Sequence, residues 1–170
     1  MKEVKDKEKI TDAIPSLETD AYIAHSDKEV QHIAEIWKDY TGRQDASLIL
    51  RAYEYAKKAH SHQKRATGEP YITHPVAATK VLLDLQLDDN TLAAALLHDT
   101  VEDTDTTLED IRREFGQEVM QLVDGVTKLS RISYSSQEEE QAQNFRKMFL
   151  AMAKDIRVVL IKLADRLHNM

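Results

Sequence analysis

The sequence contains no cysteine, and only 4 of its 170 residues are glycine and 3 are proline. The absence of cysteine excludes disulfide scaffolds, thiolate zinc sites and cysteine nucleophiles. Glycine and proline each make up about 2% of the chain, below their usual shares of about 7% and 5%. This scarcity argues against a turn-rich all-β fold.

Long hydrophobic runs are also missing. No stretch reaches the roughly 18 apolar residues of a membrane span, and residues 1–10 alternate charges where a signal peptide would be apolar. With 23 Lys and Arg against 30 Asp and Glu, the formal net charge is −7. A chain of this charge is poorly suited to broad nucleic-acid binding, although a local basic pocket for a small anion is compatible with it. We therefore expect no membrane span and no direct nucleic-acid partner.

Helical periodicity is the main pattern that the sequence does contain. Apolar residues recur every three or four positions, as on a helix with one buried face. These stripes cover residues 30–40, 49–60, 119–126, 145–152 and 156–167. The length suits a single domain with a sizeable core. The predicted fold class is all-α.

Several residues predict where the helices begin and end. Gly42 and Gly116 are expected to stop helices, and Pro75 is expected to open one. The remaining signals are an Asn90 cap for a helix over 91–100 and a capping box formed by Thr106 and Glu109.

The two ends of the chain differ from its middle. Residues 1–25 are polar and highly charged and include Pro15, so we expect a charged N-terminal extension followed by a domain over 26–170. The sequence stops at Met170 within a strong helical pattern. This leads us to expect that the domain is truncated at its C-terminal end.

One dense polar cluster directly follows the apolar run 93–97 and consists of His98, Asp99, Glu102 and Asp103. On a continuous helix these residues form two i, i+4 pairs on one side. Imidazole and carboxylate groups together suit Mn²⁺, Fe²⁺ or Zn²⁺, and a bound cation would compensate their desolvation. The alternative is a helix end with solvated charges.

Asp165 and His74 are further polar residues in apolar surroundings. Asp165 follows the largely apolar segment 158–163, with a histidine and an asparagine three and four residues further on. The alternative for Asp165 is a surface ion pair with Lys162 or Arg166. His74 lies at a turn, where the alternative is a core or cap histidine.

Together these segments resemble the N-terminal hydrolase domain of the RelA/SpoT homologue family, the bifunctional alarmone synthetase/hydrolases, over about residues 30–170. The similar blocks are 59–65, 68–75, 94–104, 124–129, 144–148 and 155–170. The resemblance implies an HD-domain metal phosphohydrolase helical bundle. It also implies one divalent metal per site, usually Mn²⁺, held by His74, His98, Asp99 and Asp165. Glu102 and Asp103 would then orient or activate the attacking water.

The same resemblance implies the substrate and the parent protein. The family hydrolyses guanosine tetraphosphate or pentaphosphate to GDP or GTP and pyrophosphate, which degrades the alarmone of the stringent response. Arg65 would pack on the guanine, with Thr67 and Asn169 near the nucleotide. A cytoplasmic parent chain with C-terminal synthetase and regulatory domains is expected. The alternatives are a nucleotide phosphatase of the same superfamily and a non-catalytic regulatory helical module.

Overall fold

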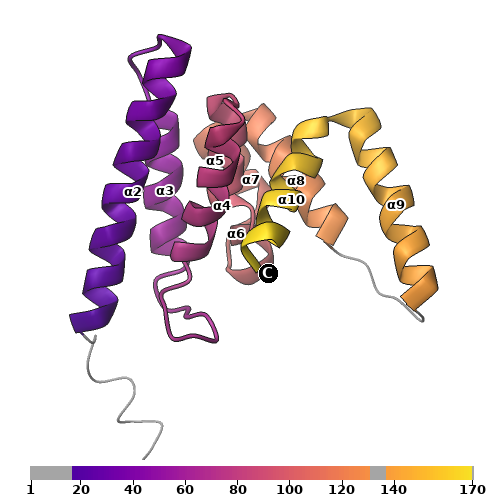
Figure 1. Ribbon diagram of the computed structural model, residues 1–170, viewed down its shortest axis with the longest axis horizontal. Coiled ribbons are helices and arrows are strands. Elements are labelled where there is room, and N and C mark those ends of the chain that lie inside the picture. Colours follow the sequence, from indigo (N-terminus) through magenta and orange to yellow (C-terminus); the bar gives the residue numbers. More distant parts are fainter. Residues whose placement is uncertain (1–16, 131–136, 170) are drawn as a thin grey trace, which may run out of the picture.

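The computed structural model describes residues 17–130 and 137–169, and this part of the chain is built from helices (Figure 1). In order, they are α2 (Leu17–Thr41), α3 (Ser47–Ala59), α4 (Thr73–Asp84), α5 (Asp89–Leu97), α6 (Thr100–Asp103), α7 (Leu108–Phe115), α8 (Gln117–Ser130), α9 (Gln137–Lys154) and α10 (Ile156–Asn169). The all-α fold class is confirmed. None of the described helices is long and apolar enough to span a membrane.

Helix α5 lies at the centre of the fold. Each residue from Thr91 to Leu97 is buried, and α5 packs against α3, α4 and α8. Residues 93–95 are all alanine, and small side chains let neighbouring helices approach closely. A helix that is apolar on all sides is expected in such an interior position. The polar cluster therefore begins where the most buried helix of the core ends.

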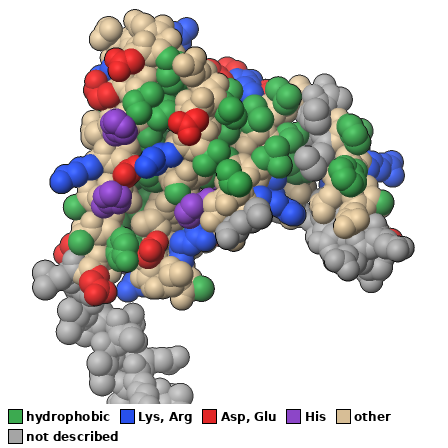
Figure 2. Space-filling model, viewed as in Figure 1, with side chains coloured by type: hydrophobic (Ala, Val, Ile, Leu, Met, Phe, Trp, Pro, Cys, Tyr) green, Lys and Arg blue, Asp and Glu red, His purple; other side chains and the backbone are tan. Residues whose placement is uncertain are grey.

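Helices α9 and α10 form a hairpin at one side of the fold, and α9 extends away from the other helices (Figure 1). Phe145 and Phe149, from the apolar stripe predicted over 145–152, are 62% and 68% exposed. Figure 2 shows hydrophobic side chains gathered over α10 on the face viewed. Two leucines of α10, Leu163 and Leu167, are also exposed. Part of the predicted apolar stripes thus lies on the surface in the described chain.

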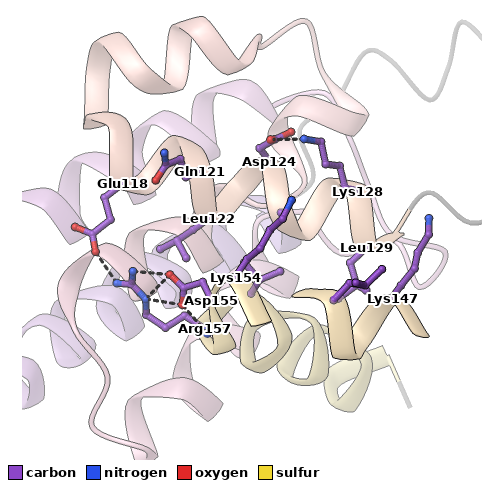
Figure 3. A pocket seen from close by; sticks show the side chains of 13 residues that line it. Glu118, Gln121, Leu122, Asp124, Lys128, Leu129, Lys147, Lys154, Asp155 and Arg157 are labelled. Carbon is purple, nitrogen blue, oxygen red and sulfur yellow. Dashed lines mark hydrogen bonds and ion pairs between the residues drawn. The ribbon is translucent and has the colours of Figure 1, made fainter. Parts of the chain in front are cut away.

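Arg157 fixes the start of α10 against two other helices. Its Nη1 atom lies 3.0 Å from Asp88 at the start of α5 and 2.7 Å from Glu118 on α8. Its Nη2 atom lies 2.7 Å from the neighbouring Asp155. Figure 3 shows the contacts of Arg157 with Glu118 and Asp155 beside a cleft between α8 and the α9–α10 hairpin, and this cleft has a volume of about 510 Å³. No candidate site residue lines that cleft.

The two predicted glycine stops are confirmed. Gly42 directly follows α2 with a φ of 71°, and Gly116 caps α7 with a φ of 97°. Both conformations lie in the left-handed region that glycine adopts without strain.

Helix α2 begins at Leu17, so residues 17–25 of the expected extension are helical, while residues 1–16 and Met170 lie outside the described residues.

Two other predicted helix starts are wrong by two residues. Helix α4 begins at Thr73, two residues before Pro75. The N-cap of α5 is Asp88, not Asn90.

The capping box of α7 is shifted by one residue from Thr106 and Glu109. Thr107 Oγ1 accepts from the backbone N–H of Asp110 at 3.1 Å, and the Asp110 carboxylate accepts from the N–H of Thr107 at 3.0 Å. Aspartate therefore serves in the place expected for glutamate. The sequence offered both pairs at the same spacing, and the backbone fold selected the second.

Gly125, in the middle of α8, permits a close approach of α8 to α10. A Cβ atom at this position would lie 2.7 Å from Cγ2 of Val158. Valine is stiff at χ1, so its methyl group cannot readily move aside. The absence of a side chain at Gly125 thus helps to set the position of α10.

We expect Gly125→Ala to lower the free energy of unfolding by about 1 kcal/mol in urea denaturation. Overpacking costs roughly 1–3 kcal/mol, and the better helix propensity of alanine recovers up to about 1 kcal/mol. In a Val158→Ala background the same substitution should be neutral or stabilising. Stabilisation by Gly125→Ala in the wild-type background would contradict the close approach.

Candidate metal centre

Three separate segments supply the side chains of the centre. His74 lies in the first turn of α4 and is 2% exposed. His98 and Asp99 lie between α5 and α6, and Asp165 lies on α10. Helix α10 packs against both α4 and α5, which brings these sequence-distant residues together.

The helix predicted over 91–100 ends at Leu97, and this corrects the expected geometry of the cluster. His98 and Asp99 form a turn before the short helix α6. The backbone N–H of Asp103 still donates to the carbonyl of Asp99 at 3.0 Å. The turn therefore keeps an approximately helical path while it directs His98 and Asp99 into the centre.

The four side chains converge at their polar atoms. Nε2 of His74 lies 2.5 Å from Oδ1 of Asp165, and Nε2 of His98 lies 3.2 Å from the same oxygen. Oδ2 of Asp99 lies 3.0 Å from Nε2 of His98 and 3.7 Å from Nε2 of His74. One ligand atom from each residue falls within 4.8 Å of the other three.

Asp165 is not the surface residue of the alternative hypothesis. It is 7% exposed, and its Oδ1 atom faces His74 and His98. The ion pair with Lys162 does form, at 3.2 Å, but through the other carboxylate oxygen. Lys162 therefore holds Asp165 from outside while Oδ1 is directed into the centre.

The pKa values of these groups follow from burial and close charge partners. Burial lowers the pKa of His98, but hydrogen bonds to Asp165 and Asp99 outweigh burial and raise it to about 10. Burial raises the pKa of Asp165 and Asp99, but hydrogen bonds with the histidines hold both below the ordinary value. The centre without metal therefore combines ionised carboxylates with a protonated imidazole.

This donor set fits a divalent cation. Nδ1 of His98 lies 2.5 Å from the backbone carbonyl of Ala95, and a carbonyl can only accept, so Nδ1 donates. Nε2 is then the nitrogen that faces the other ligand atoms, the arrangement common for metal-bound histidine. Two imidazoles and two carboxylates suit Mn²⁺, Fe²⁺ or Zn²⁺. A cation could replace the protons that balance the carboxylates.

Glu102 and Asp103 lie on α6, one turn beyond Asp99, and both are exposed. Partial desolvation raises the pKa of each, and the negative charge of Asp99 adds to this rise. They do not belong to the group of four converging side chains. Two carboxylates beside the centre, with raised proton affinity, are suited to proton transfer.

The turn over 63–71 brings two of the three predicted substrate residues together. Nη2 of Arg65 donates to Oδ1 of Asn169, near the end of α10, at 2.9 Å. Thr67 is exposed two residues further along the turn. Gly68, with a φ of 89°, closes the turn through a 2.8 Å hydrogen bond to the carbonyl of Arg65.

Several residues in contact with the centre had no predicted role. Tyr71 donates to Oδ2 of Asp99 at 2.7 Å, and Nδ1 of His168 lies 2.6 Å from Nδ1 of His74. The i+3 spacing from Asp165 placed His168 on the correct helix face, but no contact with His74 was predicted. No spacing rule links Tyr71 to Asp99, because they belong to different segments.

Comparison with known families gives a consistent assignment. The sequence model of the HD domain family matches residues 52–170. This range contains the four converging residues, both α6 carboxylates and the turn with Arg65.

Curated relatives and a solved structure are also similar to the chain. A probable guanosine-3′,5′-bis(diphosphate) 3′-pyrophosphohydrolase of Synechocystis is 58% identical over 123 residues, covering 72% of this chain and 16% of that protein. The bifunctional (p)ppGpp synthase/hydrolase SpoT of Escherichia coli K12 is 48% identical, covering 82% and 20%. The GTP pyrophosphokinase of Streptomyces coelicolor is 59% identical, covering 72% and 14%.

The solved structure comes from work described as "A metazoan ortholog of SpoT hydrolyzes ppGpp and plays a role in starvation responses". It has a TM-score of 0.59 and 32% identity, covering 75% of this chain and 70% of that one. The chain thus spans between 14% and 20% of the length of the three curated relatives. It belongs to the HD-domain family and, within that family, to the RelA/SpoT homologues.

Proposed function

We propose that the chain is a divalent-metal-dependent hydrolase that removes the 3′-diphosphate of guanosine tetraphosphate or pentaphosphate. Water adds to the phosphorus next to ribose O3′, the bond from O3′ to that phosphorus breaks, and GDP or GTP and pyrophosphate are released. The observation that carries this proposal is the convergence of His74, His98, Asp99 and Asp165 within 4.8 Å, beside two carboxylates and an arginine-bearing turn. The names of the relatives supply the substrate.

The four converging residues are the proposed metal ligands, and Mn²⁺ is the proposed metal. A bound divalent cation would polarise a phosphoryl oxygen and lower the pKa of a water molecule. His98 Nε2 is available for this role because Nδ1 donates to Ala95. Lys162 and Tyr71 each hydrogen bond to one carboxylate of the set and thereby orient it.

Glu102 and Asp103 are the proposed water-handling groups. Their raised pKa values make them stronger bases than ordinary carboxylates, so either could accept a proton from the attacking water. Arg65, Thr67 and Asn169 are proposed to contact the nucleotide. The planar guanidinium of Arg65, hydrogen bonded to Asn169, is suited to stacking on a purine.

The proposal is limited to hydrolysis. The names of the relatives include both synthase and hydrolase activities, and this chain matches at most 20% of the length of the three relatives described. We place synthetase and regulatory functions in other parts of such longer proteins.

Incubation with guanosine tetraphosphate and Mn²⁺ should release equal amounts of pyrophosphate and GDP. Release of orthophosphate from ordinary nucleoside monophosphates instead would favour the phosphatase alternative.

The metal ligands can be tested without substrate. At about 100 times its Kd, Mn²⁺ should stabilise the protein by about 2.7 kcal/mol, which corresponds to roughly 5–10 °C in Tm for a domain of this size. Asp99→Asn should abolish this difference between Mn²⁺ and EDTA, whereas Glu102→Gln should retain it. A wild-type shift in Asp99→Asn would exclude Asp99 as a ligand.

The α6 carboxylates should affect turnover and not metal binding. We expect Glu102→Gln and Asp103→Asn to keep the Mn²⁺-dependent rise in Tm but to turn over at least roughly a hundredfold more slowly, the usual scale for loss of a general acid or base. Pyrophosphate release at saturating substrate measures this effect. If both variants turn over like the wild type, the α6 carboxylates are merely solvated charges.

Arg65→Ala should mainly raise KM, by about tenfold, because a contact with the base changes little as the distant 3′ bond breaks. Arg113→Ala is a matched control, since Arg113 is exposed on α7 and pairs with Asp110. Steady-state kinetics should show an unchanged KM for this control. A collapsed kcat with unchanged KM in Arg65→Ala would place Arg65 in the chemical step.

A further inference from the structure

The base of the 63–71 turn contacts the α5–α6 junction, here residues 98–103, through two side chains. The backbone N–H of Tyr71 donates to the carbonyl of Gln63 at 3.0 Å, so these two residues face each other where the turn begins and ends. The hydroxyl of Tyr71 donates to Oδ2 of Asp99 at 2.7 Å. Nε2 of Gln63 donates to the backbone carbonyl of Asp103 at 2.5 Å. Each end of the turn thus holds one residue of the junction.

Asp99 depends on Tyr71 for its orientation. It precedes the first turn of α6, but its carboxylate makes no capping hydrogen bond to that helix. Its other polar contacts in the described chain are with His98 and His74, which are themselves proposed ligands. The Tyr71 hydroxyl is therefore a donor from outside the ligand set that fixes one carboxylate oxygen. Such outer contacts orient ligands before the metal arrives.

Asp103 depends on Gln63 in a similar way. It is the last residue of α6, which has only four residues, and a single helical turn has little stability of its own. Its backbone N–H donates to Asp99, and its carbonyl accepts from Gln63. The backbone of Asp103 is thus held at its N–H by the carbonyl of Asp99 and at its carbonyl by the side chain of Gln63.

His60 supports both of these side chains from behind. A backbone carbonyl can only accept, so Gln63 directs its NH₂ group to Asp103 and its Oε1 atom to Nδ1 of His60, at 2.8 Å. Nδ1 therefore carries the hydrogen. The His60 ring is 2% exposed and lies 4.7 Å, centroid to centroid, from the Tyr71 ring. His60 thus fixes the rotamers of Gln63 and Tyr71 together.

We propose that His60, Gln63 and Tyr71 are positioning residues that hold Asp103 at a fixed place relative to Asp99. This inference rests on the proposed function, in which Asp103 handles water and Asp99 binds metal. Tyr71 contacts the carboxylate of Asp99 and Gln63 contacts the backbone of Asp103, whereas His60 acts through these two side chains. Gln63 and Tyr71 also form the base of the turn that bears Arg65.

Tyr71→Phe removes only the hydroxyl and tests the part of the proposal that concerns Asp99. Calorimetric titration should show Mn²⁺ affinity about tenfold lower, at the lower end of the usual effect of losing an outer-shell partner. The Tm in EDTA should stay close to that of the wild type. Tyr55→Phe is the control, because the Tyr55 hydroxyl makes only a 3.5 Å contact with Thr106. Equal Mn²⁺ affinity in wild type and Tyr71→Phe would overturn the role of Tyr71.

Gln63→Met tests the part that concerns Asp103. It should retain wild-type Mn²⁺ affinity and KM but lower kcat about tenfold, a split that a general loss of stability would not produce. Unchanged kcat would overturn the role of Gln63. If the wild type binds Mn²⁺ but releases no pyrophosphate, the proposed function fails, while the Mn²⁺ affinity of Tyr71→Phe still decides the positioning role.

Discussion

The meeting of two carboxylates with two imidazoles in a buried volume is the constraint on which the rest of the structure depends. Asp99 and Asp165 would repel each other in a desolvated site unless positive charge lies between them. His98, whose pKa is raised to about 10, supplies it in the absence of metal, and Lys162 adds a second positive charge at Asp165. The same electrostatic demand favours a divalent cation, since one ion can replace the protons and contact all four ligand atoms.

This demand has consequences for packing, because the four side chains come from distant segments. Asp165 can reach His74 only if α10 lies against α4 and the core. Gly125 allows that approach by leaving room for Val158, and Arg157 fixes the start of α10 to two other helices. The polar centre is therefore supported by close apolar packing on one side of α10 and by a partly exposed ion cluster at its first turn.

The sequence predicted the fold class and the glycine stops, because periodicity and conformational freedom are local properties. The residues that meet in the centre were also anticipated, largely from the family resemblance. Local rules failed where tertiary contacts decide, as in the break after Leu97 and the choice of Thr107 over Thr106. The contact of Tyr71 with Asp99 joins residues 28 positions apart. No helical or strand period relates such positions, so only the folded chain could place Tyr71 beside the centre.

In the proposed function, the 63–71 turn links nucleotide recognition to chemistry in a way that the four converging residues alone do not. Its tip bears Arg65, which contacts Asn169 at the end of α10, and its base contacts the junction through Gln63 and Tyr71. A short, hydrogen-bonded turn thus connects the Arg65 contact with Asp99 and Asp103. Misplacement by about 1 Å can cost about a hundredfold in rate. Under the proposed function, in which Arg65 contacts the nucleotide, a nucleotide that does not seat Arg65 correctly would therefore be a poor substrate even where its phosphates reach the centre.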